Sequence, residues 1–349
     1  MQQLCQLCTS SFEMEWIINA VQLVLPTACF LCGYYALTFN FIKVRMLHSR
    51  MKFDYEQISD KKEFTTVKKY ANQSKWCTLI IMFFLYFYGI LLTSPSILNV
   101  ILYFFGLLED TQLTLPIPIG HILNAGFLYY AMLFYESIVI FIVATAALAN
   151  YATYILLVQH ACSQFSIIKM KINQPFEQNN SDISAWYDSA PQDEYTWIVD
   201  IIKRYRRVTE LVDLTNSLIE NIYLVEMFLG LFLIILDFLY LFQITALMQN
   251  KRETLMYFIY VVGSIFIIYL NFYVGQRLLD HSSKVFQELC NLPFYRISTK
   301  TQKLLLVLIM RSAKPCALSI GGMFVSSHEI FASLMQKAFS YAMVCYTMH

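Results

Sequence analysis

The chain has 349 residues, of which 58% are hydrophobic, 16% aromatic and only 14% charged. An average soluble protein carries roughly 25% charged residues, and a soluble domain must cover its surface with polar side chains. The mean hydropathy of +0.52 therefore excludes most classes of soluble protein and indicates that part of the surface faces lipid. A net charge of +1 gives no global attraction to nucleic acid.

Long apolar runs are the main feature along the chain. A helix needs about 20 apolar residues to cross the hydrocarbon core of a bilayer. Six runs qualify, each free of charge or holding one or two ionisable residues, and they occupy residues 16–42, 76–108, 122–158, 221–250, 254–276 and 315–349. The sequence therefore predicts an all-α fold, a polytopic transmembrane helical bundle with six visible spans.

The distribution of basic residues predicts the orientation of these spans. The linkers 43–75, 159–220 and 277–314 carry nine, six and seven Lys or Arg, whereas residues 1–16 and 105–121 carry none. The positive-inside rule places the three basic linkers in the cytoplasm. Both termini of this chain are then expected on the outer side.

The largest linker contains two different kinds of sequence. Residues 172–195 are rich in Asn, Gln, Ser, Asp and Pro and are predicted to be a mobile surface segment. From about residue 196, apolar residues recur every three or four positions, as they also do from Leu304 to Met310, which predicts amphipathic anchor helices. Such helices either lie on lipid headgroups or pack into a cytoplasmic bundle that joins subunits, and the composition leaves both alternatives open.

Several short motifs gather in the C-terminal third. In chain order they are Tyr273-Val274-Gly275-Gln276, Ser282-Ser283, Phe294-Tyr295, Lys303-Leu304-Leu305, Ile309-Met310-Arg311-Ser312, Gly321-Gly322-Met323-Phe324, Ser326-Ser327 and Phe339-Ser340-Tyr341. Their order and spacing resemble the carboxyl-terminal signature of insect odorant receptors, which are ligand-gated cation channels. Upstream, Asp54-Tyr55 and Glu63 are similar to the first cytoplasmic linker of that family.

The resemblance implies a function and an assembly. We expect an odorant receptor subunit of a poorly selective cation channel that detects volatile organic molecules in insect chemosensory neurons. It implies a heterotetramer with the odorant co-receptor in the plasma membrane, in the dendrites of olfactory neurons. The family has seven spans and a cytoplasmic amino terminus, so its first span is expected to be absent from this chain. Phe294 stands where the family usually has Trp.

The resemblance and the linkers together divide the chain into five parts. They are residues 1–158 with three spans and a ligand pocket in the extracellular half, 159–220 with a linker and anchor helix, 221–276 with two spans, 277–314 with anchor helices, and 315–349 with a pore-lining span. Alternative functions are a gustatory-type receptor channel of the same architecture and, further away, a G-protein-coupled receptor or a transporter. The chain has no Asn-Pro-x-x-Tyr motif and no internal repeat, which disfavours the last two.

The final run is the candidate pore helix. Tyr341, Val344, Cys345 and Met348 share one face at helical spacing, with Thr347 near the outer end. Branched and thioether side chains can close a pore by excluding water. By the resemblance, Val344 falls at the gate position, with Thr347 and Met348 near the outer mouth. The alternative is ordinary packing between helices.

Candidate odorant-binding residues lie in the outer halves of the second and third runs, where aromatic faces and a few hydroxyls suit a volatile organic molecule. They are Phe87, Tyr88, Leu92, Tyr129, Tyr130, Met132, Phe134 and Ser137. An aromatic stripe in a membrane helix is also typical of packing or of an interfacial belt.

Four ionisable residues within the runs are further candidates: Glu136, Asp237, Glu329 and Lys337. Each either serves function or makes a structural hydrogen bond, and Lys337 is placed to reach a carboxylate of a neighbouring subunit. The pairs Cys5-x-x-Cys8 and Cys29-x-x-Cys32 have metal spacing but no nearby His. No cofactor, metal site or enzymatic activity is predicted.

Overall fold

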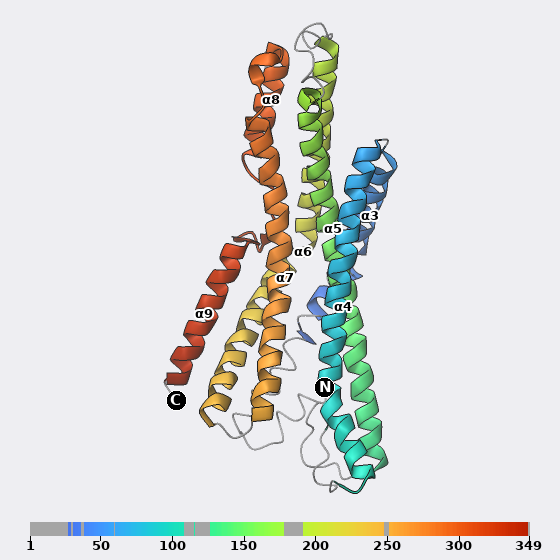
Figure 1. The fold of residues 1–349 in the computed structure, drawn as a ribbon, viewed down its shortest axis with the longest axis vertical. Helices are drawn as coiled ribbons and strands as arrows, with labels where there is room; N and C mark the ends of the chain where they lie inside the picture. Colours follow the sequence, from blue (N-terminus) through green and yellow to red (C-terminus); the bar gives the residue numbers. More distant parts are fainter. Residues whose placement is uncertain are drawn as a thin grey trace.

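The computed structural model describes residues 27–28, 31–35, 38–58, 60–107, 115, 126–177, 191–247 and 251–347. Its main elements are α3 (Phe41–Glu56), α4 (Lys61–Phe104), α5 (Phe127–Glu177), α6 (Pro191–Leu247), α7 (Lys251–Cys290), the 3-10 turn η2 (Phe294–Arg296), α8 (Thr299–Ser312), strands β1 (Ser319–Ile320) and β2 (Phe324–Val325), and α9 (His328–Thr347). The long helices run side by side along the longest axis, and α9 lies at one edge (Figure 1).

Four helices of the described part are long and apolar enough to cross a membrane. They lie in Lys61–Phe104, Phe127–Pro175, Glu194–Leu239 and Val261–Cys290, and they overlap the second to fifth predicted runs. Each of these helices is longer than a span needs. The 51 residues of α5 extend about 77 Å at 1.5 Å per residue, against a hydrocarbon core of about 30 Å.

The first and last predicted runs have different outcomes. Residues 1–26, including much of the first run and Cys5-x-x-Cys8, lie outside the described residues. The helix of the last run begins at His328, later than residue 315, because a short antiparallel β-hairpin precedes it. Gly321 and Gly322 adopt φ of 60° and 70° there, a conformation that ends regular structure and that glycine tolerates best.

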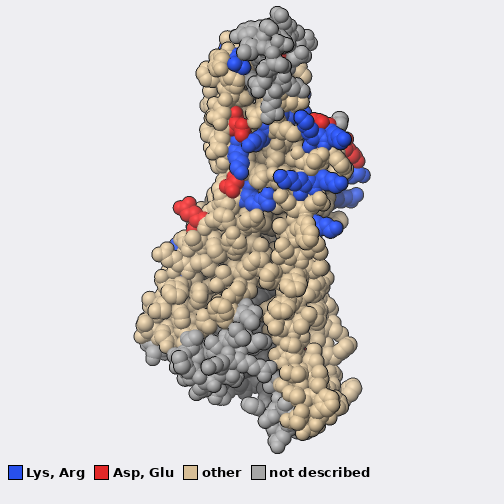
Figure 2. Space-filling model, viewed as in Figure 1, with Lys and Arg blue, Asp and Glu red and all other residues tan. Residues whose placement is uncertain are grey.

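The molecule has a charged half and an apolar half. On the face in Figure 2, Lys, Arg, Asp and Glu gather around α3 and the start of α4, while the half that holds α9 is almost free of them. We call these the charged half and the apolar half. The helices continue through the boundary without a break, so the predicted linkers are largely extensions of the spanning helices.

A packed protein core fills the charged half. Ile198 and Ile201 on α6 are fully buried, as are Phe165 and Ile172 on α5. The apolar side of the amphipathic segment of α6 is therefore buried within the chain. Whether this bundle also joins subunits stays a prediction. The prediction of a mobile segment over 172–195 is wrong at both ends, because α5 continues to Glu177 and α6 begins at Pro191. Residues 178–190 lie outside the described part.

A buried carboxylate joins three helices in this core. Glu63 at the start of α4 is 3% exposed and lies 2.9 Å from Lys171 Nζ on α5 and 3.4 Å from Arg204 Nη1 on α6. Arg204 Nε also donates to Asp200 at 3.0 Å. Burial raises the pKa of Asp200, but Arg204 and Lys171 lower it by more, so its pKa lies below the ordinary value.

A hydrogen bond between two side chains fixes α3 to α5. His160 Nε2 lies 3.1 Å from Asp54 Oδ2, and both side chains are largely buried. Asp54 and Glu63 belong to the upstream segment that resembles the family's first linker. In the structure, both residues anchor helices to the core of the charged half.

Replacing Glu63 by Gln is expected to lower the free energy of unfolding by about 3–5 kcal/mol. The positive charges of Lys171 and Arg204 would stay in the core after the carboxylate that they share is lost. Denaturant unfolding of the detergent-solubilised chain measures the change. Glu210→Gln is the matched control, since Glu210 pairs with Arg206 and Arg50 at the exposed surface and each such pair is worth no more than about 1 kcal/mol. Equal losses in the two variants would contradict the role given to Glu63.

Candidate functional site

The two faces of α9 have opposite surroundings. Ala338 and Ala342 are fully buried, whereas Tyr341 and Val344 are 58% and 54% exposed. Thr347 is also exposed, and its hydroxyl donates to the Val344 carbonyl at 3.0 Å. Three of the predicted pore residues therefore share the outward side of α9. Met348 lies outside the described residues.

Aromatic contacts hold the inner side of α9 against α6. The ring of Phe339 lies edge-on to Phe238 and Phe242, with centroid distances of 5.6 and 5.8 Å. Tyr346 contacts Phe242 near the other end of the helix, at 5.7 Å. These contacts leave the outward face without a packing partner in the described chain, so α9 is a peripheral helix supported from one side (Figure 1).

The hairpin before α9 is fixed to α6 by paired polar contacts. The Asn216 side chain donates to the Ala317 carbonyl at 3.0 Å and accepts from the Ser319 amide at 3.1 Å. Ser319 Oγ donates to Glu220 Oε1 at 3.0 Å, and the Gly321 amide donates to the Glu220 carbonyl at 3.1 Å. The hairpin is therefore anchored to one turn of α6.

A second set of contacts fixes the segment around the hairpin to α7. The Cys316 amide donates to Ser282 Oγ at 2.8 Å, and the His328 amide donates to the Gln276 side chain at 3.1 Å. Burial raises the pKa of the Cys316 thiol, which favours the neutral form. The chain entering α9 is thus held on both sides, by α6 and by α7.

The closest approach in this region is between Gly275 and Ser326. A Cβ atom at Gly275 would lie 2.2 Å from Ser326 Oγ and 2.7 Å from its backbone oxygen. Ser326 Oγ is hydrogen bonded to Tyr223 OH on α6 at 2.9 Å and donates to the Asn271 carbonyl on α7 at 3.3 Å. Tyr154 of α5 donates to the same carbonyl at 3.4 Å.

We call Tyr154, Tyr223, Asn271, Gly275 and Ser326 the coupling node, because they join three long helices to the segment that starts α9. The sequence motifs contained Gly275 and Ser326, but pattern alone gave them no role. Polar side chains within apolar runs were the available signal for Tyr154 and Tyr223, whereas Asn271 contributes its backbone carbonyl, for which the sequence carries no signal. Their meeting depends on the register of α5, α6 and α7, which no local pattern specifies.

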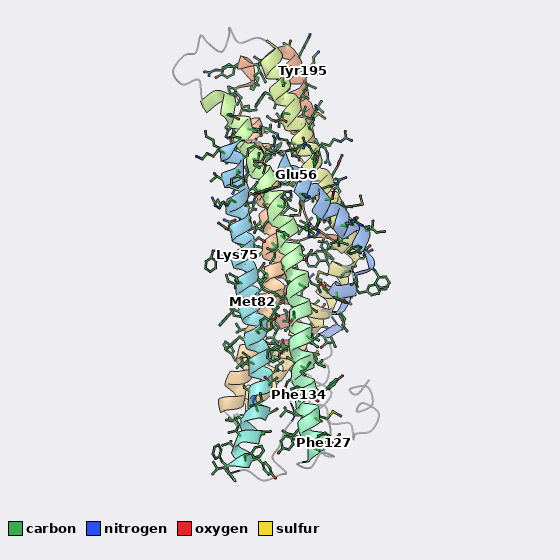
Figure 3. All side chains as sticks on the ribbon, turned by 90° about the vertical axis from the view of Figure 1, so that its right-hand side faces the viewer. Glu56, Lys75, Met82, Phe127, Phe134 and Tyr195 are labelled. Carbon is green, nitrogen blue, oxygen red and sulfur yellow. The ribbon has the colours of Figure 1, made fainter. Side chains whose placement is uncertain are left out.

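The predicted odorant-binding residues lie on α4 and α5 but do not all face one space. Tyr129 is 1% exposed and contacts the ring of Tyr130, which in turn contacts Phe104 of α4 at 6.3 Å. Phe134 is 69% exposed and lies near the end of α5 that starts at Phe127 (Figure 3).

The side chains of the remaining members of that set range from exposed to half-buried. Phe87 is 44% exposed and stacks on Phe83 at 5.8 Å, and Ser137 donates to the Leu133 carbonyl at 2.7 Å. Tyr88, Leu92 and Met132 are half-buried. Tyr129 and Tyr130 thus form the compact part of the predicted site.

An open apolar recess of about 310 Å³ lies elsewhere, between the short N-terminal helical segment and α6. It is lined by Leu31, Cys32, Tyr35, Ile222 and Val225, and by none of the predicted odorant-binding residues. Cys32 is the described member of the second Cys-x-x-Cys pair, and its position on this apolar wall suits a small hydrophobic residue.

The four ionisable candidates fall into two groups. Asp237 is fully buried and accepts a hydrogen bond from Ser264 Oγ at 2.7 Å. Glu136 is 2% exposed. Glu329 and Lys337 are exposed on α9, and Glu329 lies in the first turn, where the helix dipole favours a carboxylate.

Comparison with known proteins gives a consistent result. The family model described as "7tm Odorant receptor" matches residues 6–339. Odorant receptor 10 of Aedes albopictus is 22% identical over 177 residues, which cover 51% of this chain and 46% of that protein. The chain therefore spans less than half the length of this curated relative.

Two solved structures share the fold. The insect olfactory receptor OR5 from Machilis hrabei in complex with eugenol matches with a TM-score of 0.72 and 11% identity, over 99% of this chain and 85% of that one. Another structure of the same receptor matches with a TM-score of 0.67 and 12% identity, at the same coverage. The structural similarity extends along nearly the whole chain.

Gly275→Ala is expected to lower the free energy of unfolding by about 1–3 kcal/mol, because the added methyl group meets Ser326 backbone as well as side chain. Gly263→Ala on the same helix is the matched control. Nothing lies within 4 Å of a Cβ at Gly263, so that change should stabilise by up to about 1 kcal/mol through helix propensity. Denaturant unfolding in detergent measures both, and a stabilised Gly275→Ala variant would contradict the close contact.

Proposed function

Because the chain belongs to the insect odorant receptor family, we propose that it is a subunit of an odorant-gated, poorly selective cation channel in which α9 lines the pore. The observation that carries the proposal is the division of α9 into a buried alanine face and an exposed face with Tyr341 and Val344. Four such faces around one axis would form an apolar constriction, which closes a pore by excluding water.

The assembly we propose is a heterotetramer with the family's co-receptor in the plasma membrane. The charged half would lie in the cytoplasm, as the positive-inside rule requires for three basic linkers. All six predicted spans would then cross the bilayer, with α9 as the last one. The outward face of α9 would meet the same helix of the neighbouring subunits, and Lys337 would face a neighbouring carboxylate.

The ligand we propose is a volatile organic molecule, held in the outer half by burial more than by polar contacts. The solved Machilis hrabei receptor forms a complex with eugenol, an observation that concerns that protein. In this chain, Tyr129 and Tyr130 form the centre of the proposed site, with Phe87, Tyr88, Leu92, Met132, Phe134 and Ser137 around them. Each methylene of a ligand would add about 0.8 kcal/mol, which limits discrimination between neighbouring chain lengths.

Gating follows from differential affinity of the ligand for two arrangements. A ligand that prefers the open arrangement tenfold shifts the balance by about 1.4 kcal/mol per occupied subunit. Displacement of α5 by a ligand would reach α9 through the coupling node, because Tyr154, Tyr223 and Ser326 link these helices. Val344 would then leave the pore axis.

Recording membrane current from cells that express this chain, with and without the co-receptor, tests the assembly. A panel of volatile compounds should evoke cation current only when both proteins are present. Odorant-evoked current from this chain alone would favour a homomeric channel of the gustatory type and overturn the heteromeric assignment.

Val344→Ser is expected to raise the resting current of the co-expressed complex, because a hydroxyl lowers the cost of wetting the constriction. Val325→Ser is the matched control. It makes the same change at a residue of β2 that is 43% exposed, against 54% for Val344, and lies outside the proposed pore. Unchanged leak and unchanged ion preference in Val344→Ser would refute the gate position.

A further inference from the structure

Five lysines lie along one exposed side of the first four or so turns of α4. They are Lys61, Lys62, Lys68, Lys69 and Lys75, and all five are exposed. Residues seven positions apart in a helix differ by nearly two full turns, so these lysines form a continuous line. The opposite side buries Glu63, Val67 and Tyr70. We call the five residues the lysine stripe.

The charge of the lysine stripe is not neutralised within the described part of the chain. None of its ammonium groups forms an ion pair or a hydrogen bond there, in contrast to Lys171 on α5. Glu63, the carboxylate that shares these turns, is committed to the core. Asp60 caps the helix by accepting from the Lys62 amide at 3.0 Å, so the nearest exposed carboxylate lies beside the first two lysines only.

The stripe ends at the boundary between the charged and apolar halves. Trp76, 68% exposed, follows Lys75 directly, and the exposed side chains of the next turns are the apolar Leu79, Ile80 and Phe83. Tryptophan is typical of the headgroup level of a bilayer. The neighbouring helix α7 also changes from apolar to charged residues at this level.

Arg277, the first charged residue after the apolar run of α7, donates to the Gln73 side chain on α4 at 3.1 Å. Two helices thus place the membrane surface near residues 73–76. Lys75 lies on the outer side of α4, with the membrane-embedded Met82 further along the helix (Figure 3).

We propose that the lysine stripe binds anionic phospholipid headgroups of the leaflet on the charged side of the membrane. Lys75 lies at the level of Trp76, Lys68 and Lys69 about 11 Å above it, and Lys61 and Lys62 about 22 Å above it, at 1.5 Å per residue. The Debye length is about 8 Å at physiological salt. The contribution of each lysine to lipid binding therefore decreases with its height along α4.

The chemistry of the stripe defines the class of lipid. Lysine acts as a flexible point charge and lacks the planar fork with which arginine recognises one phosphate geometry. A line of lysines next to a spanning helix is typical of attraction to phosphatidylserine and related anionic lipids. The proposal requires that the chain spans a membrane and is independent of whether it conducts ions.

Native mass spectrometry of the purified full chain, titrated in detergent with phosphatidylserine or phosphatidylcholine, tests the proposal. We expect tighter binding of phosphatidylserine, weakened by about fivefold on removal of a lysine at the surface and by less for a lysine further along α4. Lys68→Gln/Lys69→Gln is therefore expected to weaken phosphatidylserine binding and to leave phosphatidylcholine binding and the elution volume unchanged.

The matched control is Lys61→Gln/Lys62→Gln, an adjacent pair on the same exposed side two turns earlier, with an expected effect below about twofold. Equal binding of phosphatidylserine by the wild type and the Lys68/Lys69 variant would overturn the proposal. Equal losses in the two double variants would also overturn it, because lipid binding would then depend on total charge and not on distance from the membrane surface. The assay measures no current, so its result is separate from that of the channel recordings.

Discussion

The contact between Gly275 and Ser326 is the constraint on which the position of α9 depends. The backbone oxygen of Ser326 lies 2.7 Å from the place that a Cβ atom at position 275 would take, so no side chain fits there and α7 meets the hairpin segment backbone to backbone. Tyr223 hydrogen bonds to Ser326 at the same point. Packed contacts of this kind have discrete alternatives and do not deform gradually, which suits a two-state element. In the proposed gating, a small rotation of α7 or α6 there would change the direction of α9.

The charged half supplies the fixed frame against which such a rotation acts. Its core holds fully buried apolar side chains together with paired charges, as Glu63 with Lys171 and Arg204 illustrates. The helices α5, α6 and α7 pass into the apolar half without interruption. A rigid helix that is held at its end in the charged half would move most at its end in the apolar half. Among the described residues, the ion pairs between helices all lie in the charged half, so the apolar half lacks this kind of constraint.

Periodicity and charge predicted the parts of the fold that depend on one segment at a time. The spans that became α4 to α7 followed from apolar length, and the buried side of α6 followed from Ile198 and Ile201. The start of α9 was not predicted. Gly321 and Gly322 belong to a motif of the family, and their positive φ is a property of the folded chain that the motif does not reveal. The coupling node required the register of three helices. The predicted odorant-binding residues follow from aromatic composition alone. Composition does not tell which aromatic side chains are buried, as Tyr129 is, and which are exposed, as Phe134 is.

The polarity of α9 sets it apart from the other long helices. The four helices that are apolar enough to span a membrane expose phenylalanine and isoleucine, as a lipid-facing surface does. The exposed residues of α9 include Gln336, Lys337 and Ser340 beside Tyr341 and Val344. Hydrocarbon is a poor solvent for an amide and an ammonium group, and bulk water is a poor solvent for the aromatic and branched side chains. The proposed conduit shared between subunits would accommodate both kinds, with apolar rings at the constriction and polar side chains where the pore is wet.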